Sequence, residues 1–434
     1  MANFIASPGD FLRGSIKVPG DKSISHRSIM LGSIANGVTN VSGFLEGEDS
    51  LATLNAFKDM GVKIEREGSN VVINGVGMNG LRPSLKPLNL GNSGTSIRLM
   101  TGLLSAQSFD SILCGDESLS KRPMARIIDP LSEMGAIIKS SDSMPPLSIS
   151  GNQKLSALKY TLPVASAQIK SCLLLAGLYA DGETCITENA TTRDHTERML
   201  RGFGYQVTSS SGQVSLTGGG QLQACDIEVP SDISSATFFI VAASIANNAD
   251  ITLEAVNINP TRTGVIEILK LMGANIELNN QREEASELVA DIRVCSSSLK
   301  GITIPEELVP LAIDEFPAIF IAASCAHGET FLTGARELRV KESDRIQVMS
   351  DGLSSLGIEN EVLEDGIRIK GGEFQKQTSI IKSHHDHRIS MAFAVASVRS
   401  NFEIDIEGVD NVKTSFPNFV ELANQVGMNL IETQ

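Results

Sequence analysis

The strongest constraint on the fold is a short motif that returns six times along the chain. A large apolar residue is followed by glycine and then by a strand-like pair, at intervals of roughly 70 residues, which exceeds the period of common solenoid repeats. The copies begin at Met60, Met134, Phe203, Met272, Leu356 and Val426. Each is typical of a helix that ends at a C′ glycine before a strand. The sequence therefore predicts six copies of one structural unit.

A second feature precedes each of these motifs. A short strand enters a polar turn, and a stretch rich in small apolar residues follows. The turns are Val18–Ser23, Leu90–Thr95, Val164–Gln168, Val229–Asp232, Ile313–Glu315 and His384–Arg388.

The stretches that follow these turns, such as Ala236–Ala246, are apolar nearly all round, which predicts buried helices. Later segments such as Pro123–Met134 and Thr263–Met272 have one apolar face and predict helices exposed on one side. One unit therefore reads as strand, buried helix, strand, amphipathic helix, strand, strand. Six units favour an α/β protein of two lobes, each of three βαβαββ units with helices inside and sheets outside.

Length and charge restrict the class of protein. A chain of 434 residues exceeds one ordinary core, so two domains are expected. The net charge is −15, from 51 acidic and 36 basic side chains, which argues against nucleic acid or an anionic membrane as a partner. Met1–Val18 lacks the pattern of a signal peptide. The longest apolar runs reach roughly half the ~20 residues of a membrane helix.

The six cysteines are widely separated and form no CxxC pair. In a chain of this length they indicate reduced, buried side chains of a cytoplasmic protein, and we expect none to be catalytic.

Basic residues recur in the polar turns, although the chain is acidic overall. Helix N-termini offer free N–H groups and partial positive charge to anions, so cations placed there indicate an anionic ligand. Capping alone explains Asp232, but it does not explain an added Lys, Arg or Gln. The cations of this set are Lys22, Arg27, Arg122, Arg193, Lys341, Arg345, Arg388 and Lys413.

Two carboxylates, Asp314 and Glu342, lie among these cations in the sequence. A carboxylate in a cationic site is available for proton transfer. A plain helix ion pair within Lys341–Arg345 and a solvated basic turn at Lys22 are the simpler alternatives.

The run His384–His387 is weak evidence for a metal. Adjacent histidines at a helix start point in different directions, and no matching Cys or carboxylate cluster occurs elsewhere. We expect no metal. The sequence also contains no P-loop and no nucleophile elbow.

Several of these segments resemble the signatures of the 5-enolpyruvylshikimate-3-phosphate (EPSP) synthase family over essentially the whole chain. Two further segments, Ser166–Ser171 and Thr192–Glu197, resemble the second class of these enzymes. The first class would have Ser at position 167 and Pro after Arg98. The signature segments are Pro19–Arg27, Leu90–Arg98, Arg339–Arg345, Asp386–Arg388 and Lys413–Thr414.

The resemblance implies two inside-out α/β domains of three βαβαββ units each, which close around substrate like a hinge. Residues 1–19 and 230–434 would form the first domain and residues 20–229 the second. The chain would cross between them near Val18–Asp21 and Val229–Ser231.

The implied activity is that of a 3-phosphoshikimate 1-carboxyvinyltransferase, which joins phosphoenolpyruvate to the 5-hydroxyl of shikimate 3-phosphate in aromatic amino-acid biosynthesis. Shikimate 3-phosphate would be held by Lys22, Ser23, Arg27, Ser166, Ala167, Gln168, Arg193, Asp314 and Lys341. Phosphoenolpyruvate would be held by Lys22, Gly94, Arg122, Gln168, Arg345, Arg388 and Lys413.

The implied mechanism requires two proton transfers. Asp314 would deprotonate the attacking hydroxyl, and either Glu342 or Lys22 would protonate the methylene carbon. No cofactor is expected, and we expect a monomer. Because Gly94 has no Cβ to crowd the phosphoenolpyruvate pocket, the resemblance also predicts sensitivity to the herbicide glyphosate.

Two rival functions remain. The related enolpyruvyl transferases that act on UDP-N-acetylglucosamine are expected to have Lys-Asn where this chain has Lys22-Ser23, and a reactive loop cysteine for which Cys114 is a weak substitute. A non-catalytic anion-binding scaffold would explain the basic turns, but not Asp314 and Glu342 among them.

Overall fold

The computed structural model describes residues 2–9, 11–284, 286–376 and 380–433. The chain forms two compact units. Unit 1 comprises Met1–Pro19, Pro230–Glu283 and Glu287–Gln434, and unit 2 comprises Gly20–Val229 and Glu284–Ser286. Each unit has its own hydrophobic core. None of the helices in the described ranges combines the length and the apolar character needed to cross a membrane.

Unit 2 contains three four-stranded sheets with one common topology. In two of the sheets the strand order is first, second, fourth, third; in the remaining sheet β14, the last strand in sequence, takes the first place. In all three, the strand in first place is parallel to its neighbour and the other pairs are antiparallel. The strands are β14 (Ile227–Glu228), β3 (Asn36–Ser42), β5 (Asn70–Val76) and β4 (Lys63–Glu67); β6 (Leu88–Asn89), β7 (Ser111–Cys114), β9 (Met144–Ile149) and β8 (Ile138–Ser141); and β10 (Lys159–Thr161), β11 (Glu183–Thr187), β13 (Gln213–Thr217) and β12 (Thr208–Ser210).

Unit 1 repeats this topology, with one sheet reduced to three strands. In that sheet the first strand is replaced by an isolated parallel bridge between Thr303 and Phe331. The strands are β2 (Phe11–Ile16), β15 (Asn248–Asn257), β17 (Glu287–Cys295) and β16 (Asn275–Glu284); β18 (Glu329–Leu332), β20 (Ile367–Lys370) and β19 (Asn360–Val362); and β21 (Ile380–Lys382), β22 (Ile404–Glu407), β1 (Asn3–Ser7) and β23 (Asn429–Thr433).

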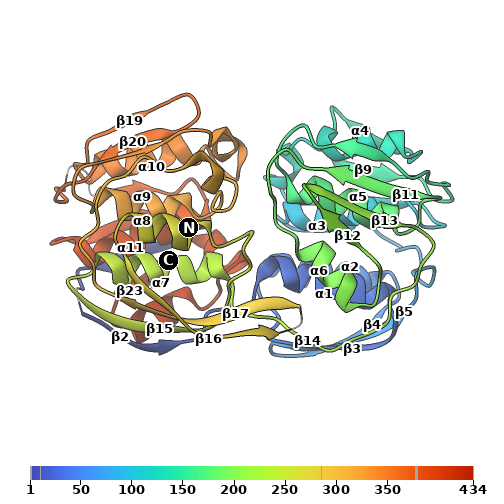
Figure 1. Ribbon diagram of the computed structural model, residues 1–434, viewed down its shortest axis with the longest axis horizontal. Coiled ribbons are helices and arrows are strands. Elements are labelled where there is room, and N and C mark those ends of the chain that lie inside the picture. Colours follow the sequence, from blue (N-terminus) through green and yellow to red (C-terminus); the bar gives the residue numbers. More distant parts are fainter. Residues whose placement is uncertain (1, 10, 285, 377–379, 434) are drawn as a thin grey trace. The chain divides into compact units, whose positions relative to one another are not determined.

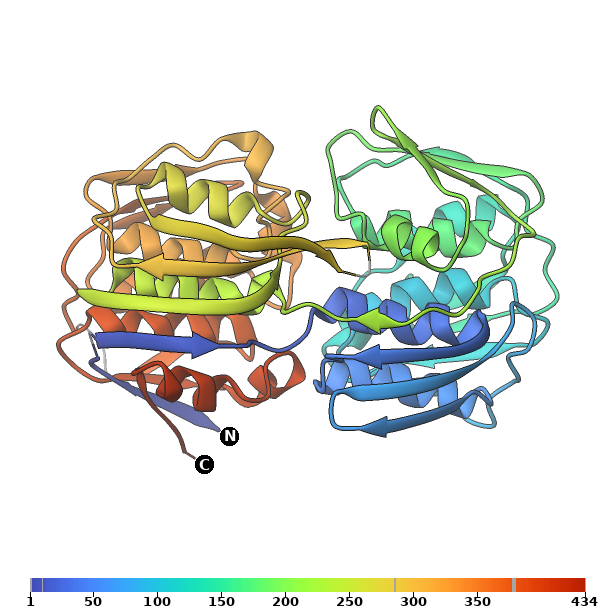
Figure 2. The same cartoon turned by 60° about the horizontal axis from the view of Figure 1, so that its bottom comes forward.

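Two strands are exchanged between repeats. Strand β2 precedes the first repeat in sequence but pairs in parallel with β15 of the fourth, and Figure 2 shows the two strands in one sheet. Strand β14 precedes the fourth repeat but pairs in parallel with β3 of the first. The last repeat is completed by β1, which lies between β22 and β23 and pairs antiparallel with both.

One helix of each repeat is buried along almost its whole length. In unit 2, α3 packs on both α1 and α5, and in unit 1 α7, α9 and α11 pack on one another (Figure 1). Every residue of α7 and of α9 is buried. The buried helices are α1 (Lys22–Ile34), α3 (Gly94–Leu104), α5 (Ala167–Gly177), α7 (Ile233–Ile245), α9 (Phe316–Ser324) and α11 (His387–Ala396).

The second helix of each repeat is buried on one side only. In α4, for example, the buried residues are Ile127, Ile128, Pro130 and Leu131. These helices are α2 (Glu48–Asp59), α4 (Ala125–Glu133), α6 (His195–Gly202), α8 (Gly264–Leu271), α10 (Arg345–Ser355) and α12 (Phe419–Gln425). Short 3-10 helices are η1 (Leu119–Lys121), η2 (Glu306–Leu308), η3 (Arg336–Val340), η4 (Ser397–Arg399) and η5 (Asp410–Thr414).

The predicted fold class is confirmed: the chain is α/β, and helices lie inside sheets in each unit. One boundary differs from the sequence prediction. Helix α4 begins at Ala125 and not at Pro123, because Arg122 is extended and Met124 is the N-cap.

The point where the chain enters unit 2 is tightly packed. A Cβ placed on Gly20 would lie 1.9 Å from the carbonyl oxygen of Gly43 and 3.0 Å from a methyl group of Val229. Pro19, the last residue of the preceding segment, accepts a backbone hydrogen bond from Asp232 at 2.9 Å. The backbone therefore approaches itself too closely here for any side chain.

We expect Gly20→Ala to lower the free energy of unfolding by about 3 kcal/mol, because a backbone carbonyl cannot move aside as a side chain can. Chemical denaturation monitored by circular dichroism measures the change. Gly372→Ala is the matched control, since its Cβ would meet only a methyl group at 3.8 Å. Equal stability of the two variants would contradict the prediction.

Candidate active site

The first cationic turn begins at the N-terminus of α1. The Asp21 side chain caps the helix by accepting a hydrogen bond from the Ile24 amide at 2.9 Å. Lys22, the first helical residue, forms an ion pair with Asp49 in the first turn of α2. The Lys22 side chain is 25% exposed, whereas that of Asp49 is 6% exposed. Asp49 thus holds the lysine from the protein side and leaves it partly open to solvent.

Arg27 lies one turn further along α1 and is almost completely buried. Its guanidinium donates to Thr196 Oγ1 at 2.7 Å, to Ser171 Oγ at 2.8 Å and to the Ser23 carbonyl at 2.9 Å. Since Thr196 belongs to α6 and Ser171 to α5, Arg27 connects three helices of unit 2. These three acceptors are neutral, so none of these hydrogen bonds neutralises the positive charge of Arg27.

His26 lies between these two cations and is fully buried. Its Nδ1 is 2.8 Å from Thr53 Oγ1 and 3.2 Å from Ser96 Oγ, and Ser96 Oγ also donates to Ser93 Oγ at 2.7 Å. Burial, followed by the charges of Lys22 and Arg27, lowers the pKa of His26 well below its usual value. A neutral imidazole thus links α1, α2 and the cap of α3.

The N-terminus of α3 gathers two arginines around Gly94. A Cβ at Gly94 would lie 2.9 Å from Arg98 Nη1 and 3.1 Å from Arg122 Nη1. Arg98 donates to Gln168 Oε1 at 2.6 Å, and Gln168 Nε2 donates to Thr95 Oγ1 at 3.1 Å. The predicted residues Gly94, Arg122 and Gln168 are therefore brought together.

Arg122 is positioned by residues of its own repeat. It donates to Asn92 Oδ1 at 2.6 Å and to Ser118 Oγ at 3.3 Å. Asn92 in turn donates to Asp116 Oδ2 at 2.8 Å. This chain of bonds fixes one edge of the guanidinium, and a planar fork held in this way is suited to a carboxylate or phosphate.

The predicted residues of the third repeat lie at two helix starts. Ser166 caps α5 by accepting from the Ile169 amide at 3.4 Å, and Ala167 and Gln168 form its first turn. Arg193 is half-buried and immediately precedes Asp194, the N-cap of α6. Lys170, by contrast, is buried against Glu197 at 2.7 Å and Glu188 at 2.9 Å, which assigns it to internal packing.

In unit 1 the predicted residues gather around Arg345, whose side chain is 1% exposed. Its guanidinium contacts three carboxylates: Glu342 at 2.6 Å, Asp386 at 2.9 Å and Asp314 at 3.4 Å. Burial alone would lower the pKa of Arg345, but Asp386, Glu342 and Asp314 together raise it above its ordinary value. The arginine is therefore a permanent positive charge that aligns the two predicted catalytic carboxylates.

Asp314 lies at the centre of this group. Its Oδ1 is 3.2 Å from Lys341 Nζ, and its backbone carbonyl accepts a hydrogen bond from Arg388 Nη1 at 2.9 Å. Asp386 caps α11 by accepting from the Arg388 amide at 3.0 Å. Asp314, Lys341, Glu342, Arg345 and Arg388 thus form one cluster, which we call the Arg345 cluster.

Lys413 does not pair with the Arg345 cluster. It follows α11 in η5, and its ammonium is bound by Glu432 of β23 at 2.6 Å, with the lysine side chain 55% exposed. Its predicted role in binding phosphoenolpyruvate stays a prediction.

Several residues that contact the predicted ones received no site role from the sequence, among them Arg98, Asp49 and Asp386. Arg98, Asp49 and Asp386 each contact a predicted residue directly. Asp386 could have been identified as an N-cap directly before a cationic helix start. Arg98 could have been identified because it lies four residues after Gly94, on the same helix face. No local pattern points to Asp49, because its contact with Lys22 depends on how α1 packs on α2.

The remaining reactive groups show no sign of chemistry. All six cysteines are free thiols, and burial raises the pKa of Cys172 to about 12 and that of Cys325 to about 11. In the described part of the chain, no group of three or more His, Cys, Asp or Glu side chains is arranged to hold a metal ion. His384 and His385 both have positive φ, while His387 opens α11.

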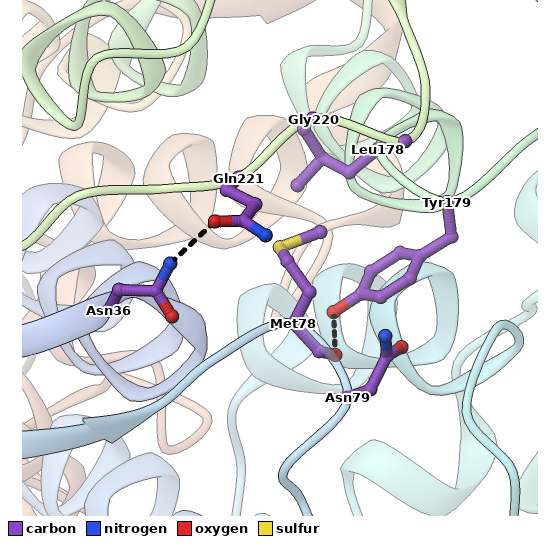
Figure 3. Close-up of a pocket in the computed structure, with 8 residues that line it drawn as sticks. Asn36, Met78, Asn79, Leu178, Tyr179, Gly220 and Gln221 are labelled. Carbon is purple, nitrogen blue, oxygen red and sulfur yellow. Dashed lines mark hydrogen bonds between the residues drawn. The ribbon is translucent and has the colours of Figure 1, made fainter.

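Unit 2 contains a cavity of about 290 Å³, which lies away from the predicted site residues (Figure 3). It is at the opposite ends of the buried helices, since Asn36 follows the C-cap of α1 and Leu178 is the C-cap of α5. Tyr179 donates to the Met78 carbonyl across it at 2.9 Å. It is lined by Asn36, Met78, Asn79, Leu178, Tyr179, Gly219, Gly220 and Gln221.

Comparison with known proteins decides the family. Residues 6–422 match the family model described as EPSP synthase (3-phosphoshikimate 1-carboxyvinyltransferase). The chain belongs to the EPSP synthase family. A 3-phosphoshikimate 1-carboxyvinyltransferase of Vesicomyosocius okutanii is 69% identical over 430 residues, covering 99% of each chain. One of Ruthia magnifica is 70% identical over 430 residues, with the same coverage.

Solved structures agree with the family assignment. An EPSP synthase from Acinetobacter baumannii superposes with a TM-score of 0.90 at 56% identity and 100% coverage of both chains. The enolpyruvyl transferase NikO from Streptomyces tendae has a TM-score of 0.79 at only 13% identity, with 100% of this chain and 99% of that chain covered. At this identity the similarity shows the fold alone. The family that the sequence resembled is thereby confirmed.

The buried His26 predicts a pH-dependent stability. Its pKa in the folded protein lies below the unfolded value of 6.5, so the unfolded chain binds the proton more readily below that pH. We expect the free energy of unfolding to fall by about 1.4 kcal/mol per pH unit below this point because of His26 alone.

Chemical denaturation between pH 5 and pH 7.5 tests this. His26→Asn should remove this part of the pH dependence, whereas the exposed His327→Asn should follow the parent. A His26→Asn variant with an unchanged slope would show that other groups cause the acid sensitivity.

Proposed function

We propose that this chain transfers the enolpyruvyl group of phosphoenolpyruvate to the 5-hydroxyl of shikimate 3-phosphate and releases inorganic phosphate, as its family name describes. The family match over residues 6–422 and the relatives near 70% identity support this assignment. The observation that carries the mechanism is the Arg345 cluster, in which one buried arginine contacts Asp314 and Glu342 together.

Shikimate 3-phosphate has a phosphate, a carboxylate and hydroxyl groups, and both units supply partners for them. In unit 2 we propose Lys22, Ser23, Arg27, Ser166, Ala167, Gln168 and Arg193. In unit 1 we propose Asp314 and Lys341, whose side chains are 3.2 Å apart. Arg27 is more buried than the other two cations proposed here, Lys22 and Arg193, so its main contribution is to hold Ser23, Ser171 and Thr196 in register.

Phosphoenolpyruvate also has one phosphate and one carboxylate but is smaller, and we assign to it the residues around the α3 N-terminus and the Arg345 cluster. These are Lys22, Gly94, Arg122, Gln168, Arg345, Arg388 and Lys413. The guanidinium groups would neutralise the carboxylate and the departing phosphate, and excluding water strengthens that effect. Binding two anions together also overcomes their repulsion and the entropy of their meeting.

The reaction needs one base and one acid. Asp314 accepts the proton of the attacking hydroxyl while the enol carbon is protonated by Glu342 or by Lys22. The tetrahedral intermediate then loses phosphate and a methyl proton. Lys341 Nζ and Arg345 Nη1 lie 3.2 and 3.4 Å from Asp314 Oδ1, so two cations hold this carboxylate in place.

We further propose that units 1 and 2 are the two catalytic domains, with boundaries after residues 19 and 229, and that the protein works as a monomer in the cytoplasm. Six free cysteines support a reducing compartment. Analytical ultracentrifugation tests the monomer.

The proposed activity is tested by measuring phosphate release with each substrate alone and with both together. Release only with both supports the transfer reaction. Release from phosphoenolpyruvate alone indicates a phosphatase, and no release under any condition supports the anion-binding scaffold.

In the same assay we expect Asp314→Asn to lower kcat by about 10²- to 10⁴-fold, the range for loss of a general base. Binding of shikimate 3-phosphate, measured by calorimetry, should persist. The control is Asp365→Asn, in which the altered carboxylate accepts only a structural hydrogen bond from the Gly334 amide at 2.9 Å. An Asp314→Asn variant with near-parental kcat would contradict the assignment of the base.

We expect glyphosate to inhibit in competition with phosphoenolpyruvate. In Gly94→Ala the new Cβ pushes against the Arg98 and Arg122 guanidiniums, which are 2.9 and 3.1 Å from it and must shift by a few tenths of an ångström. The KM for phosphoenolpyruvate and the inhibition constant should both rise, by about tenfold if the shift costs near 1.4 kcal/mol. A parent chain that tolerates glyphosate would contradict the role given to Gly94.

A further inference from the structure

Behind Arg388, on the side facing the core of unit 1, lies a buried carboxylate that the proposed reaction does not use. Glu315 directly follows Asp314 and is the N-cap residue of α9. Its residue exposure is only 2%. Its Oε1 lies 3.9 Å from Arg388 Nη1, and the Arg388 side chain is itself 15% exposed. Glu315 therefore meets Arg388 from the interior, while part of Arg388 remains accessible.

Glu315 is bound to a second arginine, which is also buried. Its Oε1 lies 3.7 Å from Arg262 Nη2 and accepts a hydrogen bond from Ser234 Oγ. Arg262 donates to Ser234 Oγ at 2.7 Å and pairs with Asp232 at 3.2 Å. Asp232 and Ser234 lie at the N-terminus of α7, Glu315 lies at that of α9, and Arg262 precedes α8, so the group connects the starts of three helices of unit 1. We call Asp232, Ser234, Arg262 and Glu315 the supporting group.

The position of Glu315 is costly for the fold. Within the described residues its Oε2 is buried and has no hydrogen-bond partner. Burying a carboxylate oxygen without a hydrogen bond is unfavourable unless nearby positive charge compensates it. The compensating charges are Arg262 on one side and Arg388 on the other. A glutamine here would have nearly the same shape but no negative charge to pair with Arg262 and Arg388, so the charge of Glu315 is what attracts these two arginines.

We infer that Glu315 is a positioning residue that fixes the Arg388 guanidinium for binding phosphoenolpyruvate. Two groups restrain Arg388 through its Nη1: the Asp314 carbonyl at 2.9 Å and the Glu315 carboxylate at 3.9 Å. The same segment, Asp314–Glu315, thus sets both the proposed base and the arginine for the second substrate. This inference rests on the function proposed above and adds a residue to it.

Two effects of removing the Glu315 charge oppose each other. Without it, Arg388 loses an inner restraint and samples other rotamers, which weakens binding of an anion. Without it, the site also becomes more positive, which strengthens binding of an anion. If positioning dominates, KM for phosphoenolpyruvate rises; if net charge dominates, KM falls.

The test is Glu315→Gln, which keeps the shape of the side chain and removes the charge. We expect KM for phosphoenolpyruvate to rise by about tenfold, the scale of a 1.4 kcal/mol loss of binding. KM for shikimate 3-phosphate and kcat should stay within about twofold, because those steps use Asp314 and Lys341. Thermal unfolding of the variant establishes that it is folded.

The matched control is Glu287→Gln, another buried glutamate of unit 1, whose Oε2 accepts a hydrogen bond from Asn259 at 2.9 Å. It should lose stability without changing either KM. If Glu315→Gln fails to fold, Ser234→Ala reaches the same carboxylate without altering charge, and it should raise KM for phosphoenolpyruvate in the same direction by a smaller factor.

A folded Glu315→Gln variant with an unchanged or lower KM for phosphoenolpyruvate overturns the inference. Equal rises in both KM values, or a fall in kcat alone, also overturn it, since they indicate a general structural effect. A parent chain that releases no phosphate from the two substrates refutes the proposed function instead, so the two failures are distinguishable.

Discussion

Each repeat of this protein buries one helix on all sides, and the rest of the structure depends on that constraint. A helix such as α7, in which every residue is buried, has no face left for charged side chains. Charged side chains of these repeats therefore lie mostly near the ends of the inner helices and in the outer layer. An uncharged polar residue further along an inner helix, such as Thr237 in α7, bonds to the backbone of its own helix. At the N-terminal ends, unpaired backbone N–H groups and the helix dipole favour anions. The position of the candidate site follows from the way the core is packed.

The cations at these ends are held by carboxylates and hydroxyls that are more deeply buried than the cations themselves. Asp49 holds Lys22, and Glu315 lies behind Arg388. Arg345 is the exception, because it is buried and holds carboxylates in turn. A lysine or arginine fixed from behind loses little entropy when a ligand arrives, which lowers the cost of binding. The acidic chain can thus present concentrated positive charge without a positive net charge.

The sequence predicted the architecture well because the repeated signals are local. Glycine after a large apolar residue marks a helix end wherever it occurs, and six such ends predict six units. The exchange of β2 and β14 between repeats was not predictable in this way, because strand partners depend on contacts distant in sequence. The crossing points came instead from the family resemblance.

The candidate site shows the same contrast between features that local sequence predicts and features that depend on contacts distant in sequence. Arg122 was identified as a cation of its turn, whereas Gly94 and Gln168 were assigned from the family resemblance, and the structure brings the three together. Asp49 and Glu315 could not be found in the same manner, since the first looks like an ordinary helix-start acid and the second like half of an acidic pair. Lys413 carries the expected motif but pairs with Glu432 at the surface. The motifs pointed to the residues that we propose for substrate binding, but not to the residues that support them.

The place of β1 has a consequence for the order in which the protein is made. Asn3 pairs with Thr433, so β1 can pair with β23 only after residue 433 has left the ribosome. Unit 2 is almost contiguous, and its core is complete soon after residue 229 emerges. In a nascent chain, unit 2 should therefore fold while β1 is still exposed and not yet paired with β23. Chaperone binding to that early strand would be a natural protection during synthesis.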